Sequence, residues 1–384
     1  MIVVAIGAIA MRSRWQLTTV DTAGRATRCS LAFSPSGNPG LAYYSSFNDE
    51  LRYATLRDDG SWDISRVDAV PRDCKPSLAF RFGQPAISYR VGGIDGASQL
   101  RYALLRAGNP PAWESYSVAA SGDASSLAFN SSQNACISYY DPETKTLKYT
   151  TASSPAVWTG QTVDADPDVG DFNALALTPL GGVTPGDLPA IAYYDRPDNY
   201  IKYAVFNGAA WQRQRVLPGL GWCSLAFDPA GWPAIGFSVK GFVANAFRDA
   251  NADFTWQYGA IPGGETGSVA YPPNSRFRHG IAYTKGGGEL KYAFGFDFWP
   301  DHFSVARPGK TQTGELIGPF AYPSLAFTPS GQPAIGYYDS GNDTIKYAVG
   351  SLFRTPMDDL RSMVNAFMFA VRAALKLGPN PSLR

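Results

Sequence analysis

The sequence contains only two histidines, His279 and His302, and four cysteines among its 384 residues. A Ser-His-Asp triad or a multi-histidine metal centre would have to use one or both of these histidines, which disfavours such chemistry. No cysteine pair has the spacing of a zinc or redox motif. The formal net charge of +1 provides no attractive field for nucleic acid. We therefore expect no metal, no cofactor and no nucleic-acid partner.

Long apolar runs and phosphate-binding loops are also absent. The sequence has no Walker or Rossmann glycine motif, and no apolar run is long enough for a transmembrane span. Cys29 and Cys74 lie at the starts of neighbouring repeats, so either a disulfide between them or two free thiols fits the sequence. Cys136 takes the place of a small buried alanine in a strand.

A four-part phrase recurs seven times along the chain. It consists of Ser-Leu-Ala-Phe, a Gly-x-Pro turn into Ile-x-Tyr-Tyr, a Leu-Lys-Tyr-Ala strand, and Trp followed five residues later by Val. The first parts of the repeats start 44 to 56 residues apart, at Ser30, Ser77, Ser126, Asn173, Ser224, Ser268 and Ser324. A period of this length, rich in aromatic and turn residues, predicts an all-β fold: a seven-bladed β-propeller.

The tryptophan part of the phrase is missing after the seventh repeat. Six repeats carry it, as Trp62 with Val67, Trp113 with Val118, Trp158 with Val163, Trp211 with Val216, Trp256 with Ile261, and Trp299 with Val305. The remaining pair, Trp15 and Val20, precedes the first repeat. We therefore predict that the N-terminal segment forms the outermost strand of blade seven, which closes the ring and removes an open sheet edge.

These repeats resemble those of bacterial seven-bladed propellers built from Ser-Leu-Ala-Phe and Ile-x-Tyr-Tyr-Asp phrases, which are distantly similar to the sialidase-like superfamily. The resemblance covers residues 15–349. Sialidases carry Asp-box turns of the form Ser-x-Asp-x-Gly-x-x-Trp, and the nearest match here, Asp58 to Trp62, lacks the leading serine. The resemblance therefore implies the fold, and it implies neither a catalytic tyrosine nor an arginine triad.

Candidate ligand-binding residues follow the second strands, on the face of the ring where propellers usually bind ligands. Acids follow Tyr-Tyr pairs in three blades, so these pairs and the irregular stretch of blade six supply the candidates: Tyr140, Asp141, Tyr194, Asp195, Tyr338, Asp339, Arg276, Arg278 and His279. For the three acids we favour turn formation over ligand binding, because Asp readily accepts backbone N–H groups in loops. For His279 we favour a purely structural role.

Two further features have competing interpretations. The acidic stretch from Asp164 to Asp171 alternates carboxylates with a glycine, but it lacks the EF-hand spacing, so we favour a solvated loop over a calcium site. Blades five and six depart most from the repeat. This departure indicates either a site or interface, or the sequence drift that we favour.

The two ends of the chain fall outside the repeats, so we divide it into an apolar extension (1–14), the propeller (15–349) and a C-terminal helix and tail (350–384). The first ten residues resemble a signal-peptide core with the basic residues on the wrong side, which favours an extracellular, periplasmic or cell-surface location. An amphipathic helix is predicted from Thr355 to Leu377. Its apolar stripe supplies the interface candidates Leu360, Met363, Val364, Phe367, Met368, Val371 and Leu375.

Three functions fit these features. The leading hypothesis is a non-catalytic structural or protein-interaction subunit that docks into an assembly, or onto copies of itself, through its terminal extensions. The alternative is a lectin-like propeller that stacks sugar rings on Tyr and Trp. A glycoside hydrolase or polysaccharide lyase is the third hypothesis, and it would require one unlike pocket with convergent acids.

Overall fold

The structure is a computed structural model that describes residues 14–24, 26, 28–72, 74–92, 98–183, 185–248, 255–273, 279–286, 288–295, 301–306 and 322–351. The described residues contain strands and no helix. None of them belongs to a helix long and apolar enough to span a membrane. The apolar extension, the predicted C-terminal helix with its interface candidates, and Arg276 and Arg278 lie outside the described residues.

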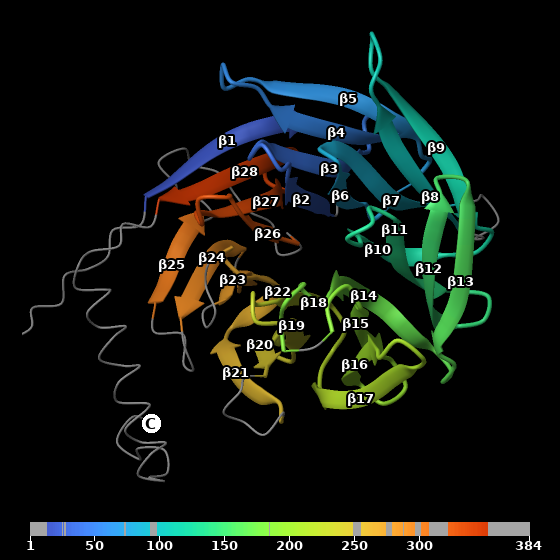
Figure 1. Cartoon of the computed structure of the whole chain (residues 1–384). Helices are drawn as coiled ribbons and strands as arrows, with labels where there is room; N and C mark the ends of the chain where they lie inside the picture. Colours follow the sequence, from blue (N-terminus) through green and yellow to red (C-terminus); the bar gives the residue numbers. More distant parts are fainter. Residues whose placement is uncertain are drawn as a thin grey trace, which may run out of the picture. The chain divides into compact units, whose positions relative to one another are not determined.

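The described strands form seven antiparallel sheets of four strands each, arranged as blades around a central axis (Figure 1). Within a blade, the Ser-Leu-Ala-Phe strand lies nearest the axis and the tryptophan strand lies outermost. The all-β seven-bladed propeller predicted from the repeats is therefore confirmed.

The first four blades follow one another along the chain. Blade one is β2 (Cys29–Phe33), β3 (Pro39–Ser45), β4 (Glu50–Leu56) and β5 (Trp62–Ala69). Blade two is β6 (Ser77–Arg81), β7 (Gln84–Gly92), β8 (Ser98–Arg106) and β9 (Ala112–Ala119). Blade three is β10 (Asp123–Phe129), β11 (Ala135–Asp141), β12 (Thr146–Ser154) and β13 (Val157–Asp164). Blade four is β14 (Val169–Leu177), β15 (Pro189–Asp195), β16 (Tyr200–Phe206) and β17 (Trp211–Pro218).

The last three blades complete the ring. Blade five is β18 (Cys223–Phe227), β19 (Pro233–Val239), β20 (Phe242–Phe247) and β21 (Gln257–Pro262). Blade six is β22 (Gly264–Ala270), β23 (His279–Lys285), β24 (Glu289–Gly295) and β25 (Asp301–Ala306). Blade seven is β26 (Ser324–Phe327), β27 (Pro333–Asp339), β28 (Thr344–Ser351) and, from the N-terminal end of the chain, β1 (Arg14–Thr22).

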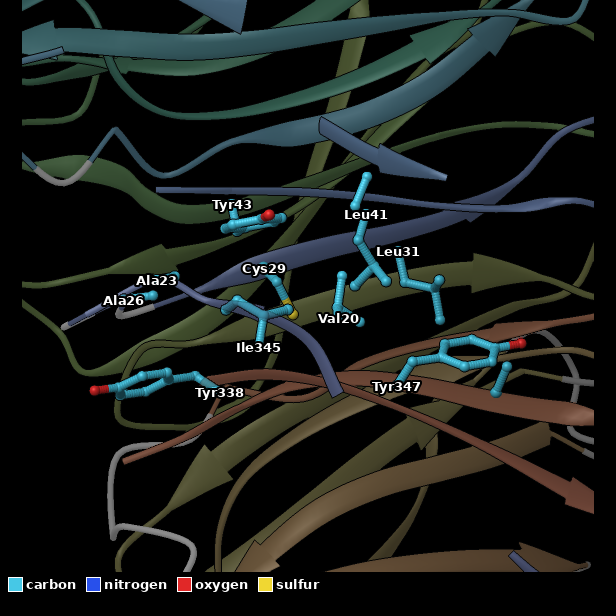
Figure 2. Packing of buried hydrophobic residues seen from close by; sticks show 12 residues of the cluster. Val20, Ala23, Ala26, Cys29, Leu31, Leu41, Tyr43, Tyr338, Ile345 and Tyr347 are labelled. Carbon is cyan, nitrogen blue, oxygen red and sulfur yellow. The ribbon is translucent and has the colours of Figure 1, made fainter. Parts of the chain in front are cut away.

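The ring closes as the tryptophan count predicts. Strand β1 pairs with β28 as the outermost strand of blade seven. Figure 2 shows the seam between blades seven and one, where Val20 of β1 and Ile345 of β28 pack with Leu31 and Leu41 of blade one. Ile345 and Leu41 are fully buried. This apolar packing explains why the chain places its first strand beside its last one.

The repeated serine links six of the seven blades to the next one; blade four has Ala174 at this position. The serine hydroxyl accepts the backbone N–H of the leucine, or of Val269 in blade six, in the following Ser-Leu-Ala-Phe strand at 2.9–3.1 Å. The last of these bonds runs from the Leu31 N–H to the Ser324 hydroxyl and joins blade one to blade seven. The serine is thus a ring-forming hydrogen-bond acceptor close to the axis.

The repeated tyrosine and tryptophan form a second link between blades. In six pairs of neighbouring blades, among the residues described, the tyrosine of the third strand meets the tryptophan of the next blade edge to face, with ring centroids 5.4–5.5 Å apart. Trp15 takes this place against Tyr292 of blade six, as a blade-seven tryptophan should. Edge-to-face pairs add stability beyond the area that they bury.

Blade four corrects the predicted repeat start by one residue. Ala174, not Asn173, pairs with the second strand as the serines do, and the N–H of Leu175 reaches the hydroxyl of Ser126. Asn173 instead donates to the Gly170 carbonyl and accepts a bond from Ser138 of blade three. Its amide, buried between the blades, therefore occupies a slot just ahead of the repeat.

All four cysteines are buried and unbridged. Of the two alternatives for Cys29 and Cys74, the structure has thiols that are not joined by a disulfide. Burial raises the pKa of Cys29 to about 12. A thiol with so high a pKa stays protonated at neutral pH and reacts slowly.

Candidate binding site at the axial mouth

The acids that follow the Tyr-Tyr pairs are engaged in their own turns. Asp141, Asp195 and Asp339 each accept a backbone N–H two or three residues further along the chain, at 3.1, 3.3 and 3.0 Å. All three are buried. This is the turn-forming role that the sequence analysis favours over ligand binding.

The second tyrosine of each pair also fastens this turn in three blades. The hydroxyls of Tyr44, Tyr194 and Tyr338 donate to an Asp or Asn side chain five residues later, at 2.6, 2.6 and 2.5 Å. These acceptor residues, Asp49, Asn199 and Asp343, have φ of 52–53°. Asp and Asn tolerate this left-handed conformation better than most residues, so the pairing fits the turn.

Blade three departs from this arrangement because Lys145 stands where the other turns have their acceptor. The hydroxyl of Tyr140 donates instead to Asp168, at 2.9 Å, in the segment leading into blade four. Burial, together with the hydrogen bond and charge of Asp168, raises the pKa of Tyr140 to about 12. Arg196 pairs with Asp171 at 2.7 Å and lies 3.8 Å from Asp168. Tyr140 thus belongs to a contact between blades three and four.

The acidic stretch from Asp164 to Asp171 is neutralised by cations of blade four. Lys202 lies 2.9 Å from Asp166 and 3.4 Å from Asp164, and Arg196 holds the two later acids. Within the described residues, no group of three or more His, Cys, Asp or Glu side chains could hold a metal ion. The acids therefore act as ion-pair partners that join two blades.

Asp164 is the most deeply buried of these carboxylates, with a side chain that is 0% exposed. It accepts the Tyr193 hydroxyl at 2.7 Å and pairs with Lys202 and Arg213. Burial would raise its pKa, but these partners and the Asp166 N–H outweigh burial, so the pKa of Asp164 lies below its usual value. Asp21 and Asp68 hold the same position, each bound to a tyrosine and an arginine of the next blade.

His279 lies at the start of β23, beside the turn between the first and second strands, and so at the opposite end of the blade from the predicted ligand face. It is 5% exposed and hydrogen-bonds Asn245 of blade five at 2.9 Å. Asn245 occupies the place of the repeated tyrosine. An Asn-His bond therefore joins blades five and six here, and burial lowers the pKa of His279 to about 4.

This depressed pKa predicts an acid-sensitive blade. Between pH 6.5 and pH 4 the unfolded chain binds a proton at His279 that the folded chain does not, so stability falls as the pH falls. The expected loss is about 3 kcal/mol by pH 4. Urea unfolding of the wild type and of His279→Gln at several pH values measures it: the difference in unfolding free energy should shift by that amount. If the unfolding free energies of the two proteins change in parallel with pH, the pKa of His279 is not lowered by folding.

The loop face is the end of the propeller at which chain segments lead into the innermost strands. On this face, the residues that stand two places before each Ser-Leu-Ala-Phe phrase form a ring around the axis. Four of these residues, Lys75, Ala124, Phe172 and Trp222, have positive φ, between 39° and 51°. Glycine would adopt this conformation with the least strain, yet bulky aromatic residues hold two of the positions. The seven residues are Arg28, Lys75, Ala124, Phe172, Trp222, Thr266 and Tyr322.

Four side chains of this ring meet across the axis. The guanidinium carbon of Arg28 lies 4.6 Å from the ring centroid of Tyr322 and 5.4 Å from that of Phe172. The Trp222 ring lies 6.1 Å from Tyr322. We call Arg28, Phe172, Trp222 and Tyr322 the axial-mouth cluster; it joins blades one, four, five and seven, and all four residues are partly exposed.

The surroundings hold this cluster in place. The backbones of Arg28 and Tyr322 form a β-bridge. Phe172 packs against Tyr194, with ring centroids 6.4 Å apart. Gly221 has φ of 75°, and a Cβ there would lie 3.0 Å from the Phe172 ring, so a larger residue would strain the backbone and press on the ring. Tyr194, a candidate from the sequence, thus supports the cluster from the side.

Arg28 differs from the other arginines around the mouth in its polar contacts. Arg90 and Arg196 pair with Asp123 and Asp171. Among the described residues, Arg28 has no hydrogen-bond acceptor and no ion-pair partner, only the two aromatic rings. A partly buried guanidinium with five unused N–H donors is a binding group for an anion.

The sequence interpretation missed this cluster. Its members belong to four blades and share no residue type, so no motif marks them. The available signal was positional: counting back two residues from the predicted repeat starts gives Arg28, Lys75, Trp222 and Tyr322, whereas Phe172 appears only after the start of blade four is corrected to Ala174.

Comparison with known proteins supports the fold. No protein-family model and no curated protein sequence matches the chain. A lectin from Burkholderia pseudomallei superposes with a TM-score of 0.63 at 14% identity, covering 86% of this chain and 96% of the lectin. The Dos1 propeller gives 0.50 at 10% identity, covering 88% and 95%. The intramolecular trans-sialidase of Ruminococcus gnavus gives 0.49 at 13%, covering 88% and 97%. At such identities the likeness concerns the fold alone.

Proposed function

We propose that this propeller is a non-catalytic interaction subunit that receives a protein partner at the axial mouth. One observation carries the proposal: Arg28, Tyr322 and Trp222 lie together, partly exposed, at the centre of the loop face. Arginine, tyrosine and tryptophan are the residue types that dominate binding energy at protein interfaces, where they cluster centrally.

The state of the loop-face acids supports a non-catalytic role. A glycoside hydrolase needs two carboxylates in unlike environments that are free to act on a substrate. Asp141, Asp195 and Asp339 instead share one turn-forming arrangement, and Asp171 is held by Arg196. The docking role predicted for the C-terminal helix remains a prediction, because that helix lies outside the described residues.

Carbohydrate binding is the second candidate, and the partly exposed rings of Trp222 and Tyr322 favour it, because sugars stack on such faces. A lectin propeller would be expected to repeat its pocket in several blades. The polar groups repeated here, the acids and tyrosines of the turns, are already engaged within the protein, either in their own turns or, for Tyr140, with Asp168. We therefore place protein interaction first.

Parallel screens with the immobilised full chain distinguish protein interaction from carbohydrate binding. A random-peptide display library should yield binders that lose affinity for Trp222→Gly, whereas a glycan array should show no retention. Glycine suits the φ of 39° at this position, so the variant removes the ring without straining the fold. Tyr258→Ala, on the outer strand of blade five, is the control for loss of an exposed aromatic side chain.

Glycan retention that Trp222→Gly abolishes would replace the proposal with carbohydrate binding. Turnover of a glycoside panel by the wild type would contradict the non-catalytic role. If peptides bind the wild type and Trp222→Gly equally well, the axial-mouth cluster is not the binding site.

A further inference from the structure

We infer that the axial mouth selects an acidic side chain of the partner, whose carboxylate pairs with Arg28 while an adjacent apolar group packs on Trp222 and Tyr322. This inference rests on the proposed interaction function and adds the chemistry of the partner. It assigns Arg28 a role in recognition, separate from the packing of the aromatic rings around it.

The geometry of Arg28 suits a carboxylate. Two rings, Tyr322 at 4.6 Å and Phe172 at 5.4 Å, contact the guanidinium and restrict its orientation. The N–H groups lie in the plane of the guanidinium, and a carboxylate matches two of them at once. A guanidinium already oriented by its neighbours loses little conformational freedom when such a pair forms.

Within the part of the chain that the structure describes, no acid pairs with Arg28. Asp171, next to Phe172 in the sequence, is held by Arg196 at 2.7 Å. Asp123 is held by Lys75 at 3.1 Å and by Arg90 at 3.2 Å. Because Asp123 and Asp171 already have cationic partners, and Arg28 pairs with no described acid, the positive charge of Arg28 remains available to an incoming anion.

The other polar groups around the mouth favour a peptide over a sugar. A sugar presents several hydroxyls that need several convergent partners. The hydroxyl of Tyr194 is bound to Asn199 and that of Tyr140 to Asp168. Among the described residues, Arg28 contacts only aromatic rings, so this pair of charged and apolar groups matches an acidic residue with an apolar neighbour.

Peptide display tests this inference with the full chain. A random-peptide library is selected on the wild type and counter-selected on Arg28→Gln. The enriched peptides should contain Asp or Glu beside an apolar residue. The most enriched peptide and its counterpart with the acid replaced by the amide are then titrated against the wild type, Arg28→Gln, Arg28→Lys and the control Arg57→Gln, a surface arginine with a 57% exposed side chain.

Removing either the charge of Arg28 or the charge of the peptide acid should weaken binding about ten- to hundred-fold. Removing both charges should weaken binding little more than removing one. Arg28→Lys should bind with intermediate affinity because lysine lacks the planar fork, and Arg57→Gln should match the wild type. Melting curves establish that each variant is folded.

The outcomes separate this inference from the proposed function. Peptides that need Trp222 but show no enrichment in acids, or that bind Arg28→Gln as well as the wild type, would overturn the carboxylate assignment and leave the interaction site. Peptides whose affinity changes with neither Trp222→Gly nor Arg28→Gln would overturn both the carboxylate assignment and the proposed interaction site.

Discussion

Deleting residues 1–22 is expected to open the ring and destabilise the propeller by roughly 5 kcal/mol or more. The deletion removes β1 from the edge of β28 and uncovers the buried seam around Ile345 and Leu41. It also removes Asp21, which accepts hydrogen bonds from Tyr43 and Arg52 of blade one. An exposed strand edge beside apolar surface promotes association, so the variant should also aggregate.

Deletion of residues 1–13 is the matched control, because it shortens the same end of the chain and leaves β1 intact. Melting temperature and light scattering, measured for both deletions, give the comparison. A 1–22 deletion that stays monodisperse and melts like the control would show that β1 does not close the ring.

Asp164→Ala is expected to have the largest effect of any single substitution among the loop-face acids, a loss of about 3 kcal/mol in unfolding free energy. The substitution leaves the buried hydroxyl of Tyr193 without its acceptor and removes one partner from both Lys202 and Arg213. Lys202 keeps Asp195 at 2.7 Å and Asp166, so its own charge remains compensated.

The repeat supplies a control for this prediction. Asp68 has the same position and the same kinds of partner, Tyr89 and Arg101, but its side chain is 21% exposed and that of Arg101 is 36% exposed. Water screens this pair, so Asp68→Ala should cost about 1 kcal/mol. Urea denaturation of both variants measures the difference. Equal losses would mean that burial of Asp164 does not govern its contribution.

The fold could be predicted because its main interactions repeat in the sequence. The displaced Trp15 predicted ring closure, since six other repeats showed where a tryptophan belongs. The same repetition explains the predicted turn role of Asp141, Asp195 and Asp339: a side chain that recurs in several blades usually serves the fold. Local spacing was sufficient for each of these predictions.

The site could not be predicted in the same way, because it depends on contacts between distant blades. Arg28 meets Phe172 only when the closed ring brings blades one and four together at the axis. His279 was misplaced on the loop face for a related reason: its partner Asn245 lies in another blade, and the irregular spacing of blade six hid its place in the strand. Blade four was misaligned because Asn173 resembles a repeat start while bonding to blade three.

A crystal structure of the full chain bound to a selected acidic peptide would show directly whether Arg28 binds the acid. We expect the peptide to lie over the axial-mouth cluster, with a carboxylate within about 3 Å of the Arg28 guanidinium and an apolar side chain on Trp222 or Tyr322. A peptide bound at a strand edge or at the opposite end of the propeller, with Arg28 still in contact only with Tyr322 and Phe172, would contradict this expectation.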